Sequence, residues 1–131
     1  EIHKVGTDAA VPPTALGEML AFLRESLEGT GLRHVVFGHI GDNHLHMNMM
    51  PGTAQELQLS KEIATRIATR AVALGGTVSA EHGIGKLKHD FLKIMYGDSG
   101  LAEMASVKRA LDPACVLNRG VMLPERLLAC S

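Results

Sequence analysis

The sequence has no tryptophan and few other aromatic residues, with one tyrosine and three phenylalanines among 131 residues. Hydrophobic residues still make up 46% of the chain, and seven of them are methionines. The core must therefore be built from aliphatic and methionine side chains, which adapt to irregular spaces. A chain of this length is expected to form one domain with a substantial core.

An excess of charge of one sign is also lacking. Thirteen Lys and Arg residues face fourteen Asp and Glu residues, so the net charge is −1 with histidine neutral. This balance leaves no electrostatic footprint for nucleic acid or an anionic membrane surface. No apolar run approaches the ~20 residues of a membrane span, and no secretory signal is visible.

Cysteine is scarce as well, since the chain has only Cys115 and Cys130. Their spacing matches no disulfide framework, so we expect buried or free thiols rather than a disulfide. Free thiols suit a reducing compartment, and the predicted location is the cytoplasm.

The spacing of the apolar residues predicts helices alternating with short strands. An extended lead-in runs to residue 10, and a capping box at Thr53–Glu56 opens a long helix that ends at Gly75-Gly76. Other helices are predicted over 14–27, 86–95 and 99–111, with a short strand over 77–80. This pattern predicts an α+β fold, a small antiparallel sheet with helices packed on one face.

A hairpin is predicted from strands 37–40 and 44–49, because Gly41-Asp42-Asn43 supplies turn residues between them. With a two-residue loop, His39 lies opposite His46, and opposed Cβ atoms are about 4.5–5.5 Å apart. A longer loop would shift this register. Side chains alternate along the second strand. One face is polar and carries His44, His46 and Asn48, whereas the other faces the core and carries Leu45, Met47 and Met49.

The pair Glu81-His82 follows on a glycine-rich segment. Two imidazoles and a carboxylate form a credible set of ligands for a divalent metal, which leaves His82 free to act as a base. A lone histidine on a strand is usually structural. On the residues alone, the metal site and the structural interpretation therefore have about equal weight.

Two segments resemble motifs of the C-terminal domain of FAD-linked oxidases in the vanillyl-alcohol-oxidase superfamily. That group includes D-lactate dehydrogenases, the glycolate oxidase flavin subunit and D-2-hydroxyglutarate dehydrogenases. The motif F-G-H-x-G-D-G-N-L-H stands here at 37–46, and G-G-x-x-S-x-E-H-G-I-G stands at 75–85. Residues 7–12 and 111–118 resemble the family's opening T-D-V-A-V-P and its closing L-D-P…L-N-P-G. The resemblance implies a portion of a ferredoxin-like cap domain.

The resemblance also implies a mechanism. By similarity, His39, His46 and Glu81 would bind a divalent metal, often zinc, that chelates the carboxylate and 2-hydroxyl of a 2-hydroxy acid. His82 would remove the hydroxyl proton while hydride passes from C2 to flavin N5, and Asn48 would hydrogen-bond the carboxylate. This division of labour is physically sound, because a metal acidifies a bound hydroxyl and the flavin carries the hydride chemistry.

Other positions have less specific roles. Lys4 lies near the opening motif and is a candidate substrate contact, and Asn118 either caps local backbone or reaches the flavin. Asn43-His44 replaces the Gly-Asn of the family motif. Asn43 tolerates the positive φ of a turn, and we interpret His44 as a substitution in the turn rather than a fourth ligand.

A flavin-binding signature is missing. Gly83–Lys86 is not a phosphate loop, because Ala80 replaces the leading glycine and no Ser or Thr follows the lysine. The chain is then a fragment or the partner of a separate flavin subunit, and its extended start favours a fragment. We expect the chain alone to carry no FAD and to be inactive. Its expected partners are a small 2-hydroxy acid, the FAD-binding domain, an electron acceptor that can bring it to a membrane surface, and a second copy in a weak homodimer.

Two alternatives stay open. A stand-alone metal-dependent hydrolase could use the same ligands with a metal-bound water, and a full-length gene product without a flavin domain would favour it. A non-catalytic binding module could keep the fold and lose the chemistry. Absence of bound metal in the purified protein would favour that alternative.

Overall fold

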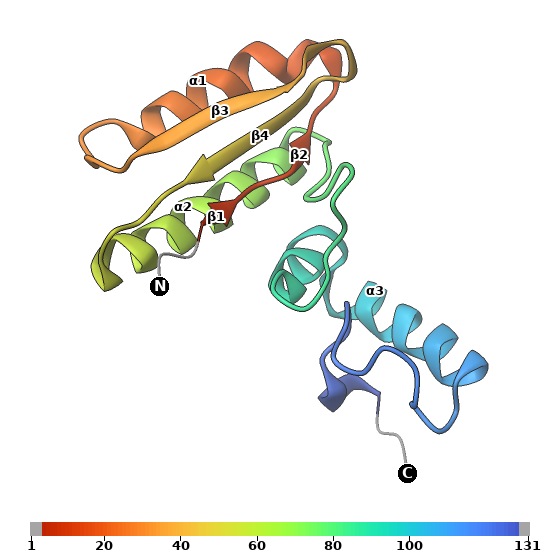
Figure 1. The fold of residues 1–131 in the computed structure, drawn as a ribbon. Helices are drawn as coiled ribbons and strands as arrows, with labels where there is room; N and C mark the ends of the chain where they lie inside the picture. The colour runs from red at the N-terminus through yellow and green to blue at the C-terminus, as the bar shows by residue number, and fades with distance from the viewer. Residues whose placement is uncertain (1–3, 129–131) are drawn as a thin grey trace. The chain divides into compact units, whose positions relative to one another are not determined.

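The computed structural model describes residues 4–128 and divides the chain into two compact units, residues 1–82 and 83–131 (Figure 1). The predicted α+β class is confirmed, because the described part contains a four-stranded antiparallel sheet and three α-helices.

The first unit is built around one central strand. Three short or edge strands pair with β4 (His44–Met49), all antiparallel. β3 lies along one edge of β4, while β1 and β2 follow one another along the other edge. The bounds are β1 Val5–Gly6, β2 Ala9–Ala10 and β3 His34–His39. The strand predicted over 77–80 is reduced to a single bridge from Thr77 to Ala10.

Two helices cover one face of this sheet (Figure 1). They are α1 (Leu16–Leu27) and α2 (Ala54–Ala73), which pack against each other. The predicted capping box at the start of α2 is confirmed, because the Thr53 hydroxyl accepts a hydrogen bond from the Glu56 backbone N–H at 3.1 Å. The Glu56 carboxylate in turn accepts from the Gly52 N–H.

The core of this unit is aliphatic and rich in methionine, as the composition predicts. Its most deeply buried side chains come from α1, α2 and β4, and they are Met19, Leu23, Met47, Met49, Ile63 and Ile67. The three strand residues Leu45, Met47 and Met49 point to the core face in alternation. The opposite face of β4 therefore carries the polar residues.

The predicted register of the hairpin is wrong. His39 lies opposite His44, and Phe37, rather than His39, lies opposite His46. Residues 40–42 form a 3-10 turn, and Asn43 follows in the left-handed conformation at φ 52°, so four residues connect the strands instead of two. The shift is by two residues, so every side chain keeps its predicted face.

The second unit contains α3 (His89–Leu111), which is interrupted at Gly97 with φ 65° and ψ −174°. This break separates the two helices that the sequence predicts there. A small core forms against both parts of this helix, and it comprises Leu92, Leu101, Ala105, Cys115, Leu123 and Leu128. Within residues 4–128, no helix is long and apolar enough to cross a bilayer.

The cysteines correct one expectation. Cys115 is buried and carries a disulfide bond, so the prediction of free thiols is wrong for this residue. Cys130 lies outside the described residues. Spacing between two cysteines says little about pairing, because pairing depends on how the chain folds back. Free thiols therefore no longer support the prediction of a reducing compartment.

Gly38 allows the close approach of β3 and β4. A Cβ atom at this position would lie 2.1 Å from the carbonyl oxygen of His44. We predict that Gly38→Ala lowers the free energy of unfolding by about 1–3 kcal/mol, because the strands must separate. Gly17→Ala is the control, since α1 leaves open space there and alanine should stabilise it by about 0.5–1 kcal/mol. Urea denaturation measures both, and equal stability of the two variants would contradict the prediction.

Asp112 at the end of α3 predicts a pH-dependent contribution to stability. The Lys108 ammonium and the backbone N–H of Leu117 lower the pKa of Asp112 below its usual 3.8, despite burial, and the Val116 N–H assists. A lowered folded-state pKa stabilises above pH 3.8, and this stabilisation is lost as the pH falls through the folded-state pKa.

We therefore expect Asp112→Asn to reduce the unfolding temperature at pH 7, with a difference from wild type that shrinks below about pH 4. Thermal unfolding across this pH range measures the effect. The matched control is Asp98→Asn, because this carboxylate is 80% exposed and pairs with Lys93 at the surface, so its loss should change stability little. A wild-type difference that stays constant with pH would contradict the assignment.

Candidate metal centre

The polar face of β4 carries two deeply buried imidazoles. His44 and His46 are 4% and 2% exposed, and Asn48 follows on the same face, partly exposed. His39 stands at the end of β3, where its side chain is 59% exposed. The segment that follows α2 brings Glu81 and His82 to the same face.

One oxygen atom is the point at which the predicted site residues converge. Oε1 of Glu81 lies 2.9 Å from Nε2 of His46 and 3.7 Å from Nε2 of His39. Nε2 of His82 lies 3.5 Å from the same oxygen. The structure therefore brings together the three residues predicted as metal ligands and the residue predicted as the base.

A buried carboxylate that the sequence analysis did not single out holds this arrangement. Oδ2 of Asp8 accepts hydrogen bonds from the Ser79 hydroxyl at 2.7 Å and from the His82 backbone N–H at 2.8 Å. Glu81 N–H also donates to Asp8, at 3.3 Å. Oδ1 of Asp8 pairs with Nε2 of His44 at 2.7 Å. Asp8 thus ties β4 to the segment that carries Glu81 and His82.

These donors also fix the charge of Asp8. Burial raises the pKa of Asp8, but the hydrogen bonds from Ser79, the His82 backbone, His44 and the Glu81 backbone outweigh burial and lower the pKa to about 2. The carboxylate is therefore an anion at neutral pH. Its only signal in the sequence is its place in the opening Thr7–Pro12 motif, which carries no ligand pattern of its own.

His46 has one ring nitrogen without a hydrogen bond. Nδ1 is buried and unpartnered, and it lies 3.8 Å from Oδ1 of Asp8. A histidine that binds a metal through Nε2 commonly directs its other N–H toward a carboxylate. The orphaned nitrogen and the nearby anion fit that arrangement.

Ring stacking fixes the orientation of His46 further. Its ring stacks on Phe37 at 5.0 Å between centroids and on His82 at 4.8 Å. His39, His44 and Glu81 are part of the lining of a hollow of about 500 Å³. Imidazole nitrogens with one carboxylate oxygen suit zinc and neighbouring transition metals. The residues present therefore fit a divalent metal.

The other predicted site residues fall into two groups. Asn48 and Lys4 both flank Gly6 on β1, because a Cβ atom there would lie 2.9 Å from Asn48 Oδ1 and 3.8 Å from Lys4 Cε. Asn48 therefore shares the polar face with His46, and Lys4 lies next to it. Asn118 belongs to the second unit, where its backbone is left-handed at φ 46°.

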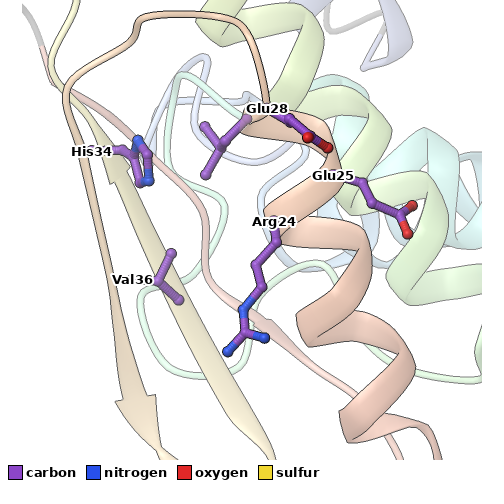
Figure 2. A pocket seen from close by; sticks show the side chains of 6 residues that line it. Arg24, Glu25, Glu28, His34 and Val36 are labelled. Atoms are coloured by element: carbon purple, nitrogen blue, oxygen red, sulfur yellow. The ribbon is translucent and has the colours of Figure 1, made fainter.

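A second hollow, of about 400 Å³, lies between α1 and β3 and is shown in Figure 2. Side chains of α1 and of β3 line it, namely Arg24, Glu25, Leu27, Glu28, His34 and Val36. Four of these six residues are ionisable, but one alone is a histidine, and within residues 4–128 they form no cluster that could hold a metal ion.

Comparison with known proteins shows the family to which this chain belongs. Residues 3–122 match the family described as FAD linked oxidases, C-terminal domain. The chain is 30% identical over 120 residues to the glycolate oxidase subunit GlcD of Bacillus subtilis, covering 90% of this chain and 26% of that protein.

Two D-lactate dehydrogenases are similar to a comparable degree. The mitochondrial cytochrome-type enzyme of Kluyveromyces lactis is 33% identical over 112 residues, covering 86% of this chain and 19% of that protein. The enzyme of Anaerostipes hadrus is 32% identical over 116 residues, which cover 86% of this chain and 24% of that protein. The chain belongs to the C-terminal domain family of FAD-linked oxidases, and it spans about a quarter or less of these relatives.

Proposed function

We propose that this chain is the metal- and substrate-binding C-terminal part of an FAD-dependent 2-hydroxy-acid dehydrogenase of the D-lactate or glycolate type. The observation that supports it most is the convergence of His39, His46 and His82 on Oε1 of Glu81. The names of the relatives support the same reaction class. The product is the corresponding 2-oxo acid.

In this proposal His39, His46 and Glu81 hold a divalent ion, with zinc as the first candidate. Such an ion lowers the pKa of a hydroxyl that binds to it, and FAD supplies the hydride acceptor. Asp8 supports the site by fixing the backbone of Glu81 and His82 on its carboxylate. Asn48 and Lys4 bind the substrate carboxylate from the neighbouring strand positions.

His82 acts as the general base. Its side chain is 58% exposed, and the ring is oriented by stacking on His46. A neutral imidazole is suited to accept a hydroxyl proton near pH 7. The flavin lies in a part of the protein other than this chain, so the chain alone binds no FAD and is inactive.

Elemental analysis tests the proposed metal ligands. Near-stoichiometric zinc, iron or manganese is expected in the purified chain, and both His39→Ala and Glu81→Ala should lose most of it, because each removes a ligand. His34→Ala is the matched control, since His34 lies on the same strand and its ring contacts the Leu32 carbonyl rather than Glu81. Metal content that is unaffected by the His39 and Glu81 substitutions would refute the ligand set.

The role of His82 is tested in the full-length gene product, with its flavin bound. His82→Gln should lower kcat for a 2-hydroxy acid by about 10²–10⁴-fold, because the base that removes the proton is lost. Metal and flavin content should stay at the wild-type level. Steady-state kinetics with D-lactate and glycolate measure this, and a kcat within a few-fold of wild type would exclude His82 as the base.

A further inference from the structure

His44 is the histidine of the cluster to which the resemblance gives no role. The family motif has asparagine at this position. The structure buries His44 within the sheet, opposite His39, rather than in the turn. Its ring centroid lies 4.1 Å from that of His46 and 5.6 Å from that of His39. It is therefore an integral part of the imidazole cluster.

One nitrogen of His44 is already occupied by Asp8. Nε2 lies 2.7 Å from Oδ1, and both side chains are almost completely buried. Because an ionised carboxylate can only accept, the imidazole donates through Nε2. In the neutral ring the lone pair is then on Nδ1, which is the nitrogen available to a metal. A carboxylate that orients a metal-binding histidine in this way is a common second-shell arrangement.

His44 lies close to the other candidate ligands of the proposed ion. His44 lines the same hollow as His39 and Glu81. One potential ligand atom from each of His39, His44, His46 and Glu81 lies within 4.8 Å of the others. A tetrahedral ion with bonds of about 2.0–2.2 Å holds its ligand atoms roughly 3.3–3.6 Å apart. The side chains therefore have to close in by about 1 Å to bring all four ligand atoms onto one ion.

We propose that His44 is a fourth protein ligand of this metal centre and that Asp8 positions it through Nε2. The ion then has three imidazoles and one carboxylate, instead of the two imidazoles and one carboxylate that the family motif supplies. This proposal rests on the proposed metal site. It concerns the coordination number and the affinity of the ion rather than the reaction.

Cobalt(II) binding by the purified chain tests the proposal through two substitutions. His44→Asn introduces the residue of the family motif, and His44→Gln removes the imidazole while keeping an N–H donor for Asp8. We expect both to weaken cobalt affinity at least about tenfold in competition with a chromophoric chelator. We also expect both to change the visible absorption spectrum, which reports coordination geometry. His34→Ala should match wild type.

Each other outcome has a distinct meaning. Wild-type affinity and spectrum in both His44 variants, with binding lost in His39→Ala, would overturn the fourth ligand and leave the metal site standing. Wild-type binding in His44→Gln alone would overturn it too, because the hydrogen bond to Asp8 would then be sufficient. Failure of the wild-type chain to bind cobalt, or full binding by His39→Ala, would overturn the metal site and with it the proposed function.

Discussion

The first unit depends on the buried carboxylate of Asp8. A carboxylate removed from water is costly unless hydrogen bonds replace its hydration. Here the Ser79 hydroxyl, two backbone N–H groups and the His44 ring supply them. These donors come from β4 and from the segment after α2, which are far apart in the sequence. Satisfying one anion therefore assembles the face on which the imidazoles meet.

Backbone pairing brings Asp8 to that position. The Thr7 N–H donates to the Met47 carbonyl at 2.9 Å, and the Met47 N–H donates to the Thr7 hydroxyl at 3.1 Å. On the other side, the Ala80 N–H donates to the carbonyl of Asp8 at 3.0 Å. Asp8 is thus held by its main chain as well as its side chain. The helices on the opposite face pack against the alternate residues of β4. The same strand therefore supplies apolar side chains to the core on one face and histidines to the candidate metal centre on the other.

Local sequence patterns predicted most of the fold because their causes are local. The alternation along β4, the capping box at Thr53 and the interruption near Gly97 depend on neighbouring residues. The register of the hairpin was missed because Gly41-Asp42-Asn43 suits turns of several lengths. The hydrogen bond between Asp8 and His44 was missed because it joins residues that are 36 positions apart in the sequence. The convergence of His39, His46 and Glu81 was anticipated, whereas their metal and the catalytic role of His82 stay predictions.

The two-residue period of the strand faces has a consequence for how this hairpin tolerates insertions and deletions. Strand faces alternate with a period of two, so a change of two residues in the pairing exchanges one polar partner for another. His39 then meets a different histidine but still points to the same side. A slip of one residue would instead place His39 opposite the core face of β4. Length variants of this turn should therefore survive in even steps, whereas odd steps require a compensating bulge.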